Sequence, residues 1–487
     1  MTSSAVSPSQ PLTFGPPLVG AGDIALADLM AALSQALDLT EGQPAGHAAR
    51  TAVIGMRLAH EIGLPQEQHA DLYFSLLLKD LGCSSNAAKM CYLFGADDRD
   101  VKRDVKVVDW TNVRKRLRFA WSQVAPQGGG LKKLLHVAAL AISGNKGAAE
   151  LIQTRCERGA HIARQFGFSS NVAAAIRSLD EHWNGRGYPE GRQGEEIPLP
   201  SRILGIAQTM EVFLAQYSPA RAMEVAQDRK GKWFDPDLVA AFCSISQESG
   251  IWDELKDPDP LALLMRHAPR ECFAKVGQQQ LDNIALGFAN VVDAKSPWTA
   301  DHSRNVAAAA KGVALEMGAT PEQAREIWIA GLLHDLGKLG VSNLILDKPG
   351  KPTDEEFAAI KRHPDYTWQI LSKVTHFDRL ADVAAAHHER IDGRGYHRQI
   401  PGDKLCLEAR ILAVADVFDA LTAARPYRPS LPMEKVDDIM IKDAGSGLCP
   451  ESLQALHAWR GRAGIDVQIE HQLETLDDLL ASGLGDD

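Results

Sequence analysis

Residues 331–338 read Gly-Leu-Leu-His-Asp-Leu-Gly-Lys, an apolar run that ends in a histidine and an aspartate. In a helix, His334 and Lys338 would be four residues apart and share a face, with Asp335 about 100° round from His334. Polar groups beside so apolar a run are costly to bury unless they are paired or bind a metal ion. The pair is therefore a candidate for metal ligation.

Histidines are concentrated in this part of the chain. Of the 16 histidines, seven lie between positions 302 and 397. A second apolar run, at 409–416, ends in Asp416 as the first ends in Asp335. Five of the histidines stand in helix-like segments: His302, His334, His363 and the adjacent His387 and His388. Any one of them alone would be read as an ordinary surface or core histidine, but with the two aspartates they form a candidate ligand set for two metal ions.

Three segments carry a resemblance to a known family: HDLGK at 334–338, HHERIDGRGY at 387–396 and ARILAVADVFDALTAARPY at 409–427. In this order they resemble the HD-GYP phosphodiesterases, which are bacterial hydrolases of cyclic dinucleotides within the HD domain superfamily of metal-dependent phosphohydrolases. The resemblance covers about 281–459. The family's Gly-Tyr-Pro is Gly395-Tyr396-His397 here. Loss of the proline removes a rigid φ angle from the loop, which bears on substrate fit more than on metal binding.

The resemblance implies which residue holds which ion. His302, His334 and Asp416 would hold one ion, and His363, His387 and His388 the other, with Asp335 bridging them. Imidazole with carboxylate suits iron or manganese, and the family resembles iron enzymes most, so we expect two divalent ions, iron before manganese. Some family members hold a third ion through a glutamate whose position is Trp298 here, and tryptophan cannot be a ligand.

Two metal ions can activate water and relieve charge on a phosphate. Asp335 and Lys338 are the predicted catalytic residues, the lysine acting as a point charge on a substrate phosphate. By resemblance, Arg425 and Arg428 would contact the cyclic dinucleotide, because a guanidinium binds a phosphate or a guanine edge with two hydrogen bonds. The predicted substrate-binding residues are Lys338, Gly395, Tyr396, Arg425 and Arg428. Plain loop packing is the alternative for Tyr396, and a solvated loop after a helix is the alternative for the two arginines.

The first half of the chain repeats these motifs. The spacing from His47 to Lys79 equals that from His302 to His334, and the segments 180–189 and 201–210 correspond to 387–397 and 409–418. The chain is therefore predicted to be a tandem duplication. In the first copy Lys79 replaces the motif histidine and Gln208 the second aspartate. Only His47 and Asp80 survive as ligands, so we expect that copy to bind no metal.

Helical periodicity runs through the chain from about residue 23, and strand patterns are weak. The predicted fold class is all-α, with two tandem helical HD-type domains. We predict a flexible tail at 1–21, a degenerate domain at 22–250, a linker at 251–275, a catalytic domain at 276–462 and an acidic C-terminal helix or tail at 463–487. Extra sequence in the first copy, at 84–135, is either a regulatory surface or a solvated helical excursion.

Composition narrows the class of protein. The chain has 487 residues, 45% hydrophobic and 24% charged, as in ordinary globular proteins. A net charge of −11 argues against a DNA-binding protein. Its seven cysteines form no C-x-x-C pair, which suits a reducing cytosol. We find no apolar run of about 18 residues and no signal peptide, so we expect a cytoplasmic protein without a membrane span.

The motifs favour a metal-dependent phosphodiesterase that hydrolyses cyclic di-GMP to pGpG or GMP in bacterial second-messenger signalling. An alternative is the same chemistry on 3′,3′-cyclic GMP-AMP, whose enzymes also resemble this chain in pairing a degenerate copy with an intact one. A third hypothesis is a catalytically silent scaffold that senses the nucleotide, which the complete ligand set disfavours; the extended motifs disfavour a general HD-type nucleotidase. Candidate partners are a diguanylate cyclase or another signalling protein, and a second copy in a homodimer.

Overall fold

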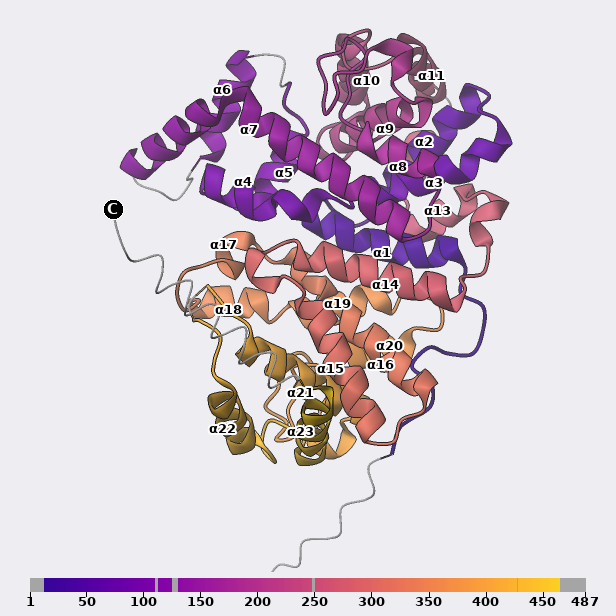
Figure 1. Ribbon diagram of the computed structural model, residues 1–487. Helices are drawn as coiled ribbons and strands as arrows, with labels where there is room; N and C mark the ends of the chain where they lie inside the picture. Colours follow the sequence, from indigo (N-terminus) through magenta and orange to yellow (C-terminus); the bar gives the residue numbers. More distant parts are fainter. Residues whose placement is uncertain (1–12, 110–112, 125–129, 248–249, 427, 465–487) are drawn as a thin grey trace, which may run out of the picture.

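The computed structural model describes residues 13–109, 113–124, 130–247, 250–426 and 428–464 (Figure 1). Within these ranges every regular element is a helix, and the β-bridges are isolated pairs. The predicted all-α fold class is confirmed. The predicted C-terminal acidic helix lies outside the described residues from position 465 on.

The first half contains thirteen α-helices among its described residues. They are α1 (Leu26–Thr40), α2 (His47–Glu61), α3 (His69–Leu78), α4 (Ala87–Phe94), α5 (Asp98–Val105), α6 (Val113–Gln123), α7 (Gly130–Gln165), α8 (Ser170–Arg177), α9 (Leu199–Gln216), α10 (Pro219–Arg229), α11 (Pro236–Gln247), α12 (Ile251–Glu254) and α13 (Pro260–His267). Helix α2 packs on α3 and α9.

The second half contains ten α-helices within the part that the structure describes. They are α14 (Gln278–Asp293), α15 (His302–Glu316), α16 (Pro321–Leu333), α17 (Asn343–Leu346), α18 (Asp354–Ile360), α19 (His363–Leu371), α20 (Asp378–Ala385), α21 (Leu407–Thr422), α22 (Met433–Asp443) and α23 (Pro450–Ala463). Helix α15 packs on α16 and α21, as α2 packs on α3 and α9. This parallel supports the predicted duplication, whose domain boundaries stay a prediction.

The two halves share one hydrophobic core. A single cluster of buried apolar side chains runs from α1 to α23. At the contact between the halves, Phe166 of α7 stacks on Phe288 of α14 with ring centroids 5.3 Å apart. Gly287 makes room for this stack, since a Cβ there would lie 2.2 Å from the Phe166 ring. Apolar burial of this kind stabilises the fold by about 25 cal/mol per Å², so the halves stabilise each other.

Two segments predicted to be loose are packed. In the predicted tail, Leu18 is 2% exposed, and its N–H donates to Glu326 Oε2 of α16 at 2.7 Å. The prediction of a flexible tail is therefore wrong for residues 13–21, because Leu18 and its backbone find partners on the second half. The predicted linker 251–275 is also folded, since α13 packs on α1 and α2 and buries Leu263 and Leu264.

Only part of the extra segment 84–135 of the first half is a solvated helical excursion. In Figure 1, α4 and α5 lie directly above α17 of the second half, and α4 contacts α17. Asp98, the first residue of α5, is completely buried. This part of the segment is therefore an interface within the chain rather than a solvated helix.

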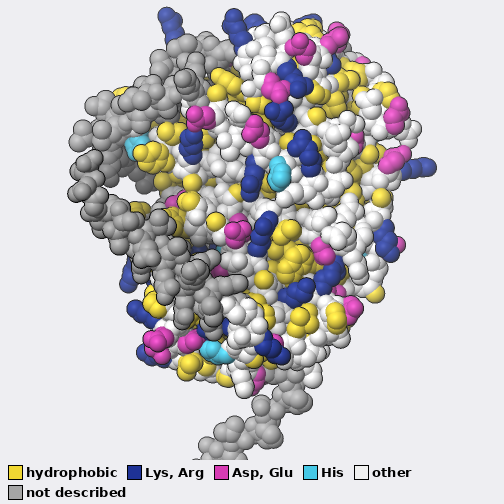
Figure 2. Space-filling view, in the orientation of Figure 1, with side chains coloured by type: hydrophobic (Ala, Val, Ile, Leu, Met, Phe, Trp, Pro, Cys, Tyr) yellow, Lys and Arg dark blue, Asp and Glu magenta, His cyan; other side chains and the backbone are white. Residues whose placement is uncertain are grey.

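The face of the molecule in Figure 2 carries acidic and basic side chains interspersed with apolar ones. Its coloured part shows no extended basic patch, which agrees with the net charge of −11. No helix among the described residues is both long and apolar enough to span a bilayer.

Candidate metal centre

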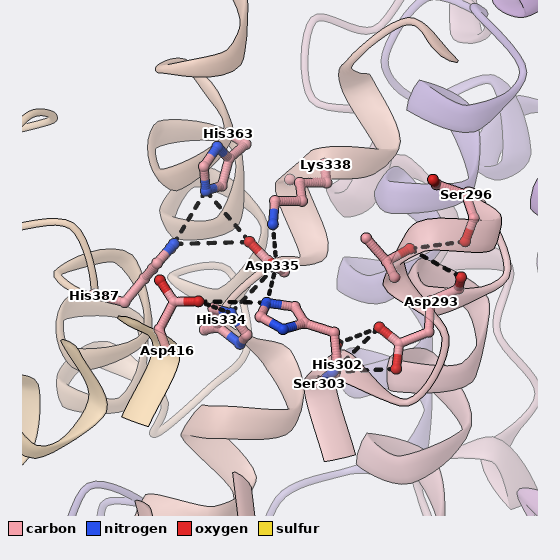
Figure 3. Close-up of polar contacts among 12 residues, drawn as sticks. Asp293, Ser296, His302, Ser303, His334, Asp335, Lys338, His363, His387 and Asp416 are labelled. Atoms are coloured by element: carbon pink, nitrogen blue, oxygen red, sulfur yellow. Dashed lines mark hydrogen bonds and ion pairs between the residues drawn. The ribbon is translucent and has the colours of Figure 1, made fainter. Parts of the chain in front are cut away.

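The structure brings all seven predicted metal ligands together. Figure 3 labels all of them except His388. They come from helix ends and from one helix interior: His302 begins α15, His334 and Asp335 follow α16, His363 begins α19, His387 and His388 follow α20, and Asp416 lies within α21. All but His388 are buried. Residues that are far apart in the chain thus converge on one polar centre inside an apolar core.

The Asp335 carboxylate lies between two groups of histidines. Its Oδ2 is 3.2 Å from both His302 Nε2 and His334 Nε2. Its Oδ1 is 3.3 Å from His363 Nε2 and 3.7 Å from His387 Nε2. A carboxylate with each oxygen facing a different imidazole group has the geometry of a bridge between two cations.

Backbone hydrogen bonds orient three of the imidazoles. In His334, His363 and His387, Nδ1 lies 2.7 Å from the carbonyl oxygen three residues earlier. Each Nδ1 is therefore the protonated nitrogen, and each Nε2 presents a lone pair to the centre. Metal-binding histidines are commonly oriented in this way by a second hydrogen bond.

A cation fits this set of donors. The buried atoms His334 Nε2 and Asp335 Oδ1 have no hydrogen-bond partner among the described residues. His363 Nε2 and His387 Nε2 lie 3.0 Å apart, although the Nδ1 bonds make both of them acceptors. Buried acceptors without donors cost free energy, and a bound metal ion removes that cost.

Asp416 and His388 complete the centre. Asp416 Oδ1 is 3.3 Å from His302 Nε2, and its Oδ2 is 3.7 Å from His388 Nδ1. His388 has a side chain that is 25% exposed, which makes it the most accessible of the seven. The centre is therefore open on the side of His388.

Burial and neighbouring charges set the protonation of the ligands. Burial lowers the pKa of His363 to about 3 and that of His388 to about 4, so both are neutral at pH 7. Burial alone would raise the pKa of Asp335, but His334 and Lys338 outweigh it and hold the pKa well below its usual range. His302 differs: burial lowers its pKa, but hydrogen bonds to Asp335 and Asp416 outweigh this effect and raise the pKa well above its usual value.

Two acidic residues that support the centre were not found from the sequence. Asp419 Oδ2 accepts a hydrogen bond from His302 Nδ1 at 2.5 Å. Asp293 accepts from the Ser303 N–H at 3.1 Å and from its hydroxyl at 2.7 Å, which fixes the start of α15. The signal for Asp419 was its position three residues after Asp416, on the same helix face. Asp293 gave no comparable signal.

Lys338 contacts Asp335 rather than sharing a helical face with His334. The α-helix ends at Leu333, and Lys338 lies in the 3-10 helix η6 (Leu336–Gly340), so the expected i, i+4 relation in one helix is wrong. Gly337 lets η6 pack closely against the start of α19, because a Cβ there would lie 2.0 Å from the His363 carbonyl oxygen. Lys338 Nζ donates to Asp335 Oδ2 at 2.5 Å.

The loop with Gly395 and Tyr396 borders the centre. The Tyr396 ring lies 4.5 Å from the His388 ring, and a Cβ on Gly395 would lie 2.5 Å from Glu389 Cα. His397 has φ of 102°, which proline cannot adopt. The replacement of the family's proline therefore changes the path of this loop. The Glu389 carboxylate fixes the loop by accepting a hydrogen bond from the Arg398 N–H at 2.8 Å.

The two predicted arginines lie beyond α21. Their backbones pair, with Arg425 N–H donating to the Arg428 carbonyl at 2.7 Å. The Arg428 guanidinium donates to the carbonyls of Leu421 at 3.0 Å and Ala420 at 2.5 Å, so it caps the C-terminus of α21. Substrate contact by either arginine stays a prediction.

A groove of about 720 Å³ borders the centre through Tyr396. Its lining residues are Lys361, Arg362, Asp365, Trp368, Tyr396, His397, Arg398 and Gln399. Cations beside aromatic rings are a surface suited to ligands that combine phosphate with a planar base.

The corresponding place in the first half is filled by ammonium groups. Lys79 Nζ donates to the Asp80 carboxylate, and Lys106 Nζ lies 2.7 Å from Glu41 Oε2. Glu41, Asp80 and Cys83 are close enough together to hold a cation, but the two lysines already neutralise the carboxylates. Burial raises the pKa of the Cys83 thiol well above its usual value, so it stays protonated. These residues do not fit a metal ion, which supports the predicted metal-free first copy.

Comparison with known proteins agrees with this geometry. The HD domain family matches residues 137–238 and 288–450. A Vibrio cholerae protein named 3'3'-cGAMP-specific phosphodiesterase 3 is 43% identical over 433 residues, which cover 88% of this chain and 94% of the relative. A cyclic di-GMP phosphodiesterase response regulator of Xanthomonas campestris is 41% identical over 165 residues, which cover 34% of this chain and 43% of the relative.

One solved structure matches most of the chain. It is a cyclic GMP-AMP specific phosphodiesterase of V. cholerae, with a TM-score of 0.64 and 39% identity, covering 90% of this chain and 98% of that one. The chain therefore belongs to the HD domain family and, within it, to the HD-GYP phosphodiesterases, as its motifs predicted. It is accordingly a hydrolase.

Asp419 offers a test of how the centre is supported. Asp419→Asn removes the charge that stabilises His302, so we expect metal affinity to fall by about ten- to a hundredfold, measured by competition with a chelator. Glu211→Gln is the matched control, because Glu211 occupies the same position in the first half, where its carboxylate accepts from His47 Nδ1. A similar loss of metal affinity in both variants would contradict the assignment of Asp419 as a support of the metal centre.

Metal binding is expected to release a proton. Because the pKa of His302 is raised well above its usual value in the metal-free protein, its proton is held at pH 7 and must leave before Nε2 can bind a cation. Metal affinity should therefore strengthen as pH rises and weaken as it falls. Titration calorimetry in two buffers with different ionisation enthalpies should count about one proton released per chain at pH 7. Release close to zero would mean that His302 is neutral before binding.

Proposed function

We propose that this protein is a metal-dependent phosphodiesterase that hydrolyses 3′,3′-cyclic GMP-AMP. The chemistry rests on one observation, the Asp335 carboxylate with each oxygen facing a different histidine group. The substrate rests on the relative named 3'3'-cGAMP-specific phosphodiesterase 3, which aligns over 94% of its length. Cyclic di-GMP is the second candidate, favoured by the shorter alignment with the Xanthomonas protein. The order predicted from the sequence, with cyclic di-GMP first, is reversed.

The ligands divide into two groups around Asp335. We assign His302, His334 and Asp416 to one ion, and His363, His387 and His388 to the other, with Asp335 shared. The mixed imidazole and carboxylate set suits iron, with manganese as the alternative. When bound, the two ions supply an activated water and positive charge for the phosphate.

The protein's own groups then bind and orient the substrate. Lys338 has a side chain that is 17% exposed, and its ammonium lies against Asp335, so it can move from that carboxylate to a phosphate oxygen. Tyr396 forms the wall between the centre and the groove, where a base could stack. The buried carboxylate of Asp335 stays ionised and holds the imidazoles in place.

A silent scaffold is the competing function of another class. Loss of catalysis would be expected to leave gaps in the ligand set, as in the first half, where Lys79 and Gln208 replace ligands. The second half has every ligand. We therefore retain hydrolysis, and leave a cytoplasmic location, a homodimer and a signalling partner such as a diguanylate cyclase as predictions.

Turnover of three substrates tests the proposal. We expect kcat/KM for 3′,3′-cyclic GMP-AMP to exceed that for cyclic di-GMP and cyclic di-AMP by at least about tenfold, measured by chromatography with the iron-loaded and the manganese-loaded protein. A preference for cyclic di-GMP would favour the second candidate. Binding without hydrolysis of any of them would favour the scaffold.

Two substitutions separate ligation from substrate binding. Asp335→Ala removes the shared carboxylate, so both hydrolysis and metal content should be lost. Lys338→Ala should keep the metal, because the ammonium is not a ligand, and lower kcat by about a hundredfold through the lost phosphate contact. Metal content is measured by elemental analysis and kcat by product formation. Equal loss of metal in both variants would refute the assignment of Asp335 to metal ligation and Lys338 to substrate binding.

A further inference from the structure

A buried cluster of charges joins the two halves outside the metal centre. Asp98 of α5 is 0% exposed, and its Oδ2 lies 3.4 Å from Lys295 Nζ of the second half, which is 1% exposed. Lys102, one turn along α5, lies 3.2 Å from the same oxygen. A buried lysine without a carboxylate would be strongly unfavourable, so Asp98 holds Lys295 where it is.

One arm of the cluster reaches the segment that carries Lys338. Asp98 Oδ1 accepts a hydrogen bond from the Asn343 N–H at 3.2 Å, and Asn343 Nδ2 donates to the Lys295 carbonyl at 2.6 Å. The next residue of α5, Arg99, donates from Nη1 to the Gly340 carbonyl, two residues after Lys338. The chain that leaves Lys338 is thus anchored to α5 at positions 340 and 343.

The other arm reaches the start of α15. Lys295 stands two residues after Asp293, whose carboxylate accepts from the backbone and hydroxyl of Ser303. Ser303 is the neighbour of His302, and Figure 3 shows Asp293 beside both of them. The same buried cluster therefore contacts the segments that lead to His302 and away from Lys338.

We propose that Asp98 and Arg99 are positioning residues for the reaction, which rests on the proposed function. They touch neither the centre nor the groove. They fix the backbone on which Lys338 stands, and a shift of about 1 Å in a group that orients a substrate can lower turnover by about a hundredfold. The first half thus acts on catalysis through two side chains of its extra segment, although its own ligand set is lost.

The bonds suit this role because they are directional. An apolar contact between α5 and the second half would allow the surfaces to slide. The buried Asp98 carboxylate accepts from four donors, which are Lys102, Lys295, the Asn343 N–H and the Cys91 thiol, and so defines one register. Arg99 is itself held by Asp97, whose Oδ2 lies 2.9 Å from Arg99 Nη2. Both residues belong to the extra segment 84–135, for which the second half has no counterpart.

The test compares variants of the full chain loaded with metal. Arg99→Ala and Asp98→Asn should each lower kcat about tenfold on 3′,3′-cyclic GMP-AMP and on bis(p-nitrophenyl) phosphate, with unchanged metal content. Arg103→Ala is the control on the same helix, because within the described part of the chain Arg103 pairs only with Asp100 and Asp104. Glu211→Gln is the control for loss of a buried charge in the first half. Both controls should keep kcat.

A double-variant cycle separates positioning from stability. In a Lys338→Ala background, Arg99→Ala should cause no further loss of kcat, since the group it positions is gone. The proposal would be overturned if the losses of kcat in the double variant were additive, or if Arg99→Ala kept full kcat. If Asp98→Asn does not fold, the result for Arg99→Ala alone decides. If the unsubstituted protein hydrolyses only bis(p-nitrophenyl) phosphate, the cyclic dinucleotide assignment is refuted, but the positioning role can still be tested on that substrate. If the unsubstituted protein hydrolyses none of the substrates, both the proposed function and the positioning role are refuted.

Discussion

The buried carboxylate of Asp335 is the constraint on which the centre depends. A charge that is 1% exposed is tolerated only where cations or donors surround it. The protein meets this need by ending or beginning helices α15, α16, α19 and α20 at its edge, so that their terminal side chains point inward. Helices can then diverge and pack their apolar faces while one polar centre remains among their ends.

Much of this centre could be predicted from the sequence because His334, Asp335, His387, His388 and Asp416 lie in three local motifs. His387 and His388 are adjacent, and His334 and Asp335 are adjacent, so their proximity needs no knowledge of the fold. The relation of Lys338 to the centre could not be predicted, because the chain forms a 3-10 helix after α16, at a point where Gly337 packs against the His363 carbonyl. That contact joins residues on different helices, and spacing within one helix does not report it.

The same distinction applies to the fold. Helical periodicity predicted the helices, since it depends on neighbours three and four residues apart. The packed state of residues 13–21 and the burial of Asp98 depend on partners more than 190 positions away, at Glu326 and Lys295. A Ser- and Pro-rich start and a charged helix both look solvated when their partners are unknown.

The path of the chain limits how the two halves can move. Residues 13–20 lie on the second half, with the Leu18 carbonyl accepting from the Leu380 N–H at 3.2 Å, before the chain enters the first half at α1. The chain then returns to the second half through 251–275. The first half is therefore attached at both of its ends. Rotation about a single hinge would have to break the contacts that bury Leu18 on the second half. Signals between the halves must pass through small shifts at a closed interface rather than through opening of the molecule.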